Sequence, residues 1–120
     1  MAKLYPTEGQ ITRSGDHMVM AVREDEVARL VIEVDDSVDG KDTAEAVAEV
    51  EAELGRLNRS RVPAMYNLGA CHRKGFVRAK YDAKLVIRDI DERIEAFKIA
   101  RKRLKKNLTD ARRRARAAAA

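Results

Sequence analysis

The chain has few of the residues that cross-link a fold or fill a large core. It has one cysteine, Cys71, and no tryptophan, and aromatic residues make up only 4% of it. A single thiol cannot close a disulfide within the chain, which indicates a reducing compartment. Because Ala, Glu, Lys, Leu and Arg dominate instead, the composition favours long helices over a thick globular core.

Long apolar runs are also missing. No segment approaches the roughly 20 apolar residues that a membrane-spanning helix needs. The N-terminal residues 1–6 lack the apolar stretch of a signal peptide. We therefore expect a cytoplasmic protein that has no membrane partner.

The strongest pattern in the sequence is that of one long C-terminal helix. Neither Gly nor Pro follows Gly75, and apolar residues recur in alternating steps of four and three from Ala83 to Ala115. Arg101 alone interrupts this seam. At ~1.5 Å per residue the stretch spans roughly 50 Å, so its seam must meet a helix of this chain or of a copy. We predict a coiled-coil-like helix and a homo-oligomer whose seam is formed by Ile87, Ile90, Ile94, Phe97, Leu104 and Leu108.

A second helix is predicted before it. Asp42 or Thr43 caps its start, and an apolar seam follows at Val47, Val50, Leu54 and Leu57. We expect residues 58–63 to end or bend this helix, so that the long helix begins near residue 61. Residues 69–75 contain two glycines, which mark either a close helix contact or a kink. Residues 42–120 are thus predicted to form a helical hairpin.

Residues 1–41 are predicted to form an N-terminal arm. Its first sixteen positions include the turn-forming residues Pro6, Gly9, Ser14, Gly15 and Asp16, and two β-favouring runs follow at residues 18–22 and 30–34. We predict a β-hairpin here, with its turn at residues 24–26. A competing interpretation is a helix from Glu24, because Val27, Leu30, Val31 and Val34 also fit one helical face. The predicted fold class is therefore mainly α, with a short N-terminal β-hairpin.

No set of residues predicts catalysis or a bound cofactor. The acidic loop at residues 35–40 lacks the ligand spacing of a calcium loop. One cysteine and two histidines, His17 and His72, are too few for a zinc site, and Cys71 and His72 point about 100° apart on a helix. The carboxylates of the long helix are expected on its solvent side, at Asp89, Asp91, Glu92 and Glu95. We predict a protein that is not an enzyme and that holds no metal.

Charge divides the chain into two unlike halves. Residues 1–60 hold seven basic and fourteen acidic side chains, and residues 61–120 hold eighteen basic and six acidic ones. The positive charge is densest near the end of the long helix, at Arg101, Lys102, Arg103, Lys105, Lys106, Arg112, Arg113, Arg114 and Arg116. Such a run is either a solvated surface or a segment that binds nucleic acid or another polyanion.

A second basic cluster lies earlier on the predicted helix. Its members are Arg73, Lys74, Arg78, Lys80 and Lys84, and two aromatic residues are interleaved with them. Cations follow a phosphate backbone, and aromatic rings stack on unpaired bases. We expect Phe76 to belong to the helix seam, and the position of Tyr81 stays open.

A loose pattern of Ala, Tyr and Lys runs through residues 44–100. It includes Ala64-Met65-Tyr66, Ala70, Arg73-Lys74, Ala79-Lys80-Tyr81 and Ala83-Lys84. This stretch resembles small helical proteins of tailed bacteriophages, among them recombination mediators that bind single-stranded DNA as ring-like oligomers. The resemblance implies DNA contact at Lys74, Arg78, Lys80 and Lys84, and a place in the host cytoplasm or the virion.

These patterns lead to one expected function and one alternative. The first is a non-enzymatic, oligomeric protein that binds nucleic acid without sequence specificity through its basic C-terminal half. The alternative is a structural assembly protein, possibly of a phage virion, that packs copies through its helices and its N-terminal hairpin. In the alternative, the basic end binds an acidic neighbour.

Overall fold

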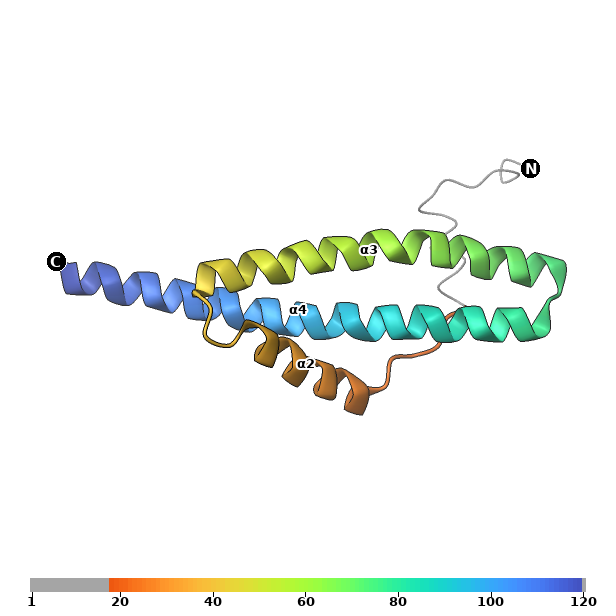
Figure 1. The fold of residues 1–120 in the computed structure, drawn as a ribbon, viewed down its shortest axis with the longest axis horizontal. Coiled ribbons are helices and arrows are strands. Elements are labelled where there is room, and N and C mark those ends of the chain that lie inside the picture. Colours follow the sequence, from red (N-terminus) through yellow and green to blue (C-terminus); the bar gives the residue numbers. More distant parts are fainter. Residues whose placement is uncertain (1–17, 120) are drawn as a thin grey trace.

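The computed structural model describes residues 18–119, which form three helices and no strand. They are α2 (Glu24–Val38), α3 (Thr43–Lys74) and α4 (Val77–Ala119). The helices α3 and α4 run antiparallel, and α4 lies between α3 and α2 (Figure 1). The structure is elongated, with extents of 64 × 33 × 18 Å. The prediction of a mainly helical hairpin is confirmed.

The long C-terminal helix is one unbroken element of 43 residues. No residue within it breaks a helix, and its seam supplies a continuous apolar face. An i,i+4 ion pair lies along its surface, with Arg93 Nε 3.6 Å from Asp89 Oδ2. Near its C-terminus α4 continues past the start of α3, as Figure 1 shows. The prediction of a continuous rod beyond residue 83 is thus confirmed.

The helix α3 does not end at residues 58–63, and the long helix begins at Val77 and not near residue 61, so this part of the prediction was wrong. Helix α3 continues through Pro63 to Lys74. Pro63 lies on the exposed side of the helix, while Leu57 and Met65 on either side of it are buried against α4. Burial of this face offsets the hydrogen bond that proline removes. Ser60 lies within α3 and donates its hydroxyl to the carbonyl of Arg56 one turn earlier.

The turn between α3 and α4 is at Gly75 and Phe76. Gly75 has a φ of +70°, a left-handed conformation that favours glycine. The N–H of Gly75 donates to the carbonyl of His72 at 3.2 Å, and that of Phe76 donates to the carbonyl of Cys71 at 3.0 Å. This pair of hydrogen bonds is a Schellman motif, which ends a helix. Gly75 therefore marks the end of α3, whereas the prediction for residues 69–75 was a close helix contact or a kink within one helix.

The predicted N-terminal β-hairpin is wrong within the described residues. Residues 24–38 form α2, and residues 18–23 lead into it without strand structure. The side chains of Val27, Leu30, Val31 and Val34 lie on one face of α2 and are buried. Because this face meets α4, tertiary packing overrides the β preference of these residues. The competing interpretation, a helix that begins at Glu24, is confirmed. Residues 1–17 are outside the described part of the chain.

The core follows α4 in two parts. Near the turn, Leu68 of α3 packs with Ile87 and Ala83 of α4, and both Leu68 and Ile87 are fully buried. Farther along, α2 packs onto α4 where Ala96 and Ala100 bring the helices close together. Complete burial of one large aliphatic side chain stabilises the fold by about 1.5–3 kcal/mol.

Candidate nucleic-acid interface

The structure separates the predicted cations into two groups at opposite ends of the hairpin. Arg73 and Lys74 end α3, and Arg78, Lys80 and Lys84 occupy the start of α4. We call these five residues the turn cluster. The remaining predicted cations, from Arg101 to Arg114, lie toward the other end of α4, far from the turn (Figure 1). A single small contact therefore cannot engage both groups.

The cations near the end of α4 form a continuous face. At about 100° per residue, eight of them fall within about 140° of the helix circumference. They are Lys98, Arg101, Lys102, Lys105, Lys106, Arg112, Arg113 and Arg116, and we call them the cationic face. All are exposed except Arg101, which is half-buried. Arg114 is predicted to lie outside this arc, on the far side of the helix from Lys105.

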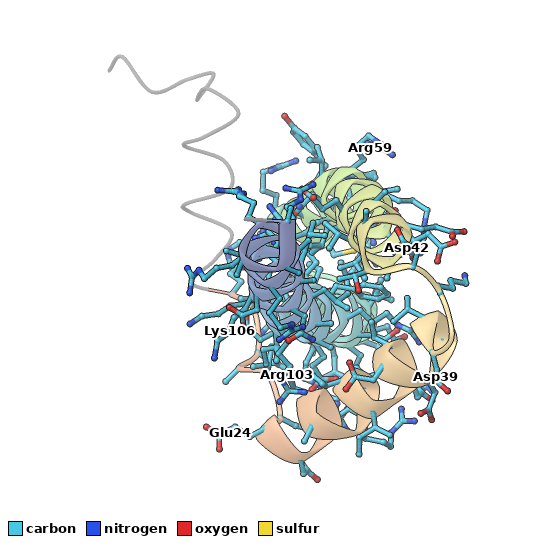
Figure 2. All side chains as sticks on the ribbon, turned by 90° about the vertical axis from the view of Figure 1, so that its left-hand side faces the viewer. Glu24, Asp39, Asp42, Arg59, Arg103 and Lys106 are labelled. Carbon is cyan, nitrogen blue, oxygen red and sulfur yellow. The ribbon has the colours of Figure 1, made fainter. Side chains whose placement is uncertain are left out.

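Few of these cations are neutralised within residues 18–119. Lys105 Nζ lies 3.5 Å from Glu51 Oε2, and Arg103 Nη1 lies 3.5 Å from Asp35 Oδ2. Both contacts are exposed and long, so they contribute little. Figure 2 labels Arg103 on the side of α4 toward α2, and Lys106 on another side, away from α2 and α3. The cationic face is thus open to a polyanion.

The last part of α4 has no neighbour in the described chain. Every side chain from Ala111 to Ala119 is exposed, and Leu108 is half-buried. We call residues 108–119 the projecting end. Its four arginines make no ion pair with any acid among residues 18–119. This segment contributes charge to the surface without contributing to the core.

The turn cluster combines cations with exposed aromatic rings. The prediction that Phe76 belongs to the helix seam was wrong, because Phe76 lies in the turn and is 55% exposed. Lys74 Nζ lies 5.9 Å from the centroid of the Phe76 ring. Tyr81, whose position was left open, is 54% exposed. The turn therefore presents two rings beside its positive charge.

The predicted oligomer seam is largely used within the chain. Ile87 and Ile94 are buried, and Ile90, Phe97 and Leu104 pack against buried residues of α3 and α2. The expectation that these residues meet another copy is therefore corrected, since α3 and α2 of the same chain cover them. Only Leu108 of this set belongs to the projecting end.

The sequence interpretation also failed for Glu92, which is fully buried and does not lie on the solvent side of α4. Its carboxylate accepts hydrogen bonds from Arg23 N at 2.8 Å, Nε at 2.9 Å and Nη2 at 2.9 Å. These side-chain hydrogen bonds lower the pKa of Glu92 to about 2, although burial acts in the opposite direction. The pair joins the start of α2 to α4 and is structural.

A second stripe on α4 could have revealed this burial. Leu85, Ala96 and Ile99 share a helix face with Glu92, beside the main seam. That stripe marks the side of α4 that α2 covers. Asp91 is also drawn inward, because Arg61 of α3 donates to it from Nε at 2.6 Å and from Nη2 at 3.3 Å. Asp89 and Glu95 are exposed, as predicted.

No other cluster in the described chain suggests bound chemistry. Cys71 is buried and His72 is exposed. Residues 18–119 contain no group of acidic, cysteine and histidine side chains that could hold a metal ion. His17 lies outside the described part. No helix among the described residues has the length and apolar character needed to cross a bilayer.

Comparison with protein-family models, with curated protein sequences and with solved structures finds no match to this chain. The resemblance to phage recombination mediators therefore remains a prediction.

Proposed function

We propose that this protein is a non-enzymatic, oligomeric nucleic-acid-binding protein that recognises the phosphate backbone without sequence specificity. The cationic face of α4 carries the proposal, because it is exposed and little neutralised. At the projecting end, the side chains of the cationic face also make no contribution to the core. Such a surface attracts polyanions by charge and releases their counterions on contact.

The dimensions of the cationic face fit nucleic acid. Residues 98–116 span roughly 27 Å along the helix, and a duplex presents a phosphate charge about every 1.7 Å of its axis. The projecting end is also narrow where its side chains are small, at Ala111, Ala115, Ala117, Ala118 and Ala119. A single helix of this kind fits the major groove, which is about 12 Å wide. The body of the hairpin stays outside the groove.

The turn cluster supplies a second contact of a different character. Phe76 and Tyr81 offer exposed rings on which unpaired bases stack, and Lys74 supplies charge beside them. We therefore expect the turn to favour single strands, while the cationic face binds duplex and single strands alike.

The experiment measures affinity for a labelled random-sequence 30-base-pair duplex by fluorescence anisotropy, from low to moderate salt. Substitution of Arg112, Arg113 and Arg116 by alanine removes three charges from the cationic face. If all three contact phosphates, the slope of log affinity against log salt becomes shallower by roughly 2–3. The parent chain must bind at low salt for the proposal to stand.

A matched control removes the same charge from the acidic half. Arg29, Arg56 and Arg59 are exposed arginines of α2 and α3, and their replacement by alanine lowers the net charge equally. We expect this control to keep the slope of the parent. Equal slopes for the two variants would show that net charge, and not the cationic face, determines binding.

The turn is tested separately with single-stranded DNA of the same length. Replacing Lys74, Lys80 and Lys84 by glutamate should weaken single-strand binding more than duplex binding. A variant that binds both like the parent would exclude the turn cluster from the interface. Replacing Phe76 and Tyr81 by leucine keeps the charge and isolates the contribution of stacking.

A structural assembly role is the second candidate, and one separate observation favours it. An open groove of about 580 Å³ lies between α2 and α4, and most of its lining is apolar. Exposed apolar surface of this kind is typical of protein–protein contacts. The role predicts a large oligomer in the absence of nucleic acid, and a stable monomer by light scattering would contradict it.

A further inference from the structure

The groove between α2 and α4 presents apolar side chains on a surface that is otherwise mostly charged. Its apolar lining comes from Val22, Val27, Ala28, Val31, Ile32 and Ile99. Ile32 is 61% exposed on a helix whose outer surface is otherwise mostly charged. Together with the exposed Val22 and Ala28 of the same groove, Ile32 forms a contiguous apolar patch. Contiguous exposed apolar surface is typical of a contact with another molecule.

The rim of the groove is acidic. Glu24 and Glu95 line it, and at one end Arg103 Nη1 lies 3.5 Å from Asp35 Oδ2. On α2, Glu24, Asp25, Asp35 and Asp36 fall with Ile32 within about 120° of the helix circumference. Glu24, Asp25 and Asp36 form no ion pair with any residue from 18 to 119. The groove is thus suited to an apolar helix edge that is flanked by cations.

The projecting end of α4 has this pattern. Leu108, Ala111 and Ala115 form a narrow apolar stripe, with Arg112 on one side of it and Arg114 on the other. The lengths also agree. The groove extends over residues 24–32 of α2 and 95–103 of α4, about 12 Å, and the stripe extends over roughly 11 Å.

The projecting end cannot reach the groove of its own molecule. The groove is built on residues 95–103 of α4, and α4 continues from there to Ala119 as one helix. Since no glycine or proline interrupts this stretch, the helix cannot turn back onto itself. The complementary surfaces can meet only between two molecules.

We propose that the groove between α2 and α4 binds the projecting end of α4 from a second copy of this chain. The contact joins two different surfaces, so a pair of bound copies still leaves one groove and one projecting end free. Repetition of such a contact gives a growing chain of copies unless the chain closes into a ring. Because the projecting end also carries Arg112, Arg113 and Arg116 of the cationic face, association between copies is tested without nucleic acid.

The test uses sedimentation velocity of the full chain over a wide concentration range. The groove variant is Ile32→Lys, which places a cation opposite the arginines of the projecting end. The end variant is Ala111→Glu with Ala115→Glu, which places acids against the acidic rim. All three positions are exposed, so the fold is retained. We expect the parent to associate as its concentration rises, and either variant to weaken association at least tenfold.

Each variant has a matched control. Val86→Lys changes an exposed apolar side chain of α4 outside the groove. Thr109→Glu with Ala117→Glu adds the same two acids away from the apolar stripe. Both controls should associate like the parent. A control that dissociates as strongly as its partner variant would contradict the proposal.

Mixing the two variants gives the decisive result. The groove variant keeps a functional projecting end, and the end variant keeps a functional groove, so together they should form a dimer of one copy each and nothing larger. A parent chain that stays monomeric at every concentration would overturn the proposal. So would variants that associate like the parent, or a mixture that contains only monomers.

Discussion

The two parts of α4 are one continuous helix with opposite surroundings. From Ala83 to Leu104 one side of the helix is covered by α3 and α2, and Ile87, Glu92 and Ala96 are buried there. From Ala111 to Ala119 every side chain is exposed, and all of the charged side chains are positive. The first part fixes the fold, and the second part offers a surface.

This difference indicates that the charge of the projecting end and the stability of the fold depend on different parts of α4. In the covered part, a charged group is tolerated only with a partner, as Glu92 is with Arg23. In the projecting end, four arginines need no acidic partner because water surrounds them. Substitutions there should change binding without unfolding the protein.

The largest expected effect contrasts two aliphatic side chains of α4. Ile87→Ala removes a fully buried side chain and should lower the free energy of unfolding by about 3–4 kcal/mol. Leu108→Ala removes a half-buried side chain beside solvent and should cost less than about 1 kcal/mol. Urea denaturation followed by circular dichroism measures both. Similar losses would show that the projecting end belongs to the core.

The next effect concerns the charge of Glu92. Its pKa is about 2 in the folded protein and 4.5 ordinarily, so its contribution is complete above pH 4.5 and is lost as pH falls toward 2. Glu92→Gln should lower the free energy of unfolding by about 2–3 kcal/mol near pH 7 and should flatten its pH dependence in that window. Asp110→Asn is the control at the other end of α4 and should leave the profile unchanged. A parent profile that is flat between pH 4.5 and 2 would contradict this role.

The smallest expected effects come from substitutions that change helix propensity at one covered and one uncovered position. Gly55→Ala in α3 should raise the free energy of unfolding by about 0.5–1 kcal/mol, since the added methyl group meets only the flexible end of Arg59 at 3.2 Å. Ala115→Gly should reduce helix content in the far-ultraviolet spectrum without moving the urea midpoint. A shift of the midpoint by Ala115→Gly would mean that the projecting end folds together with the core.

Much of the fold was predictable from local pattern. The long helix follows from an apolar seam without glycine or proline, and the first half of α3 follows from Val47, Val50, Leu54 and Leu57, all of which are buried. The basic residues near the end of α4 can also be recognised in the sequence, because their exposure requires no contact with a distant residue. These features need only the period of a helix.

The remaining features depend on contacts between distant residues. Residues 27–34 are valine- and isoleucine-rich, so their local preference does not separate a strand from a helix, and packing on α4 decides. Glu92 is buried because Arg23, 69 positions away, meets it. The continuation of α3 through Pro63 depends on burial of Met65 and Leu68 beyond it. The residues next to these positions in the sequence do not reveal which distant residues they contact.

The most direct test of the central claim is a paired measurement on one variant, Arg112→Ala/Arg113→Ala/Arg116→Ala. Its affinity for duplex DNA as a function of salt and its urea unfolding curve are recorded under the same conditions. We expect the slope of log affinity against log salt to be shallower by roughly 2–3 than that of the parent, and the unfolding midpoint to equal that of the parent. An unchanged slope, or an altered midpoint, would contradict the claim that the projecting end is a binding surface independent of the fold.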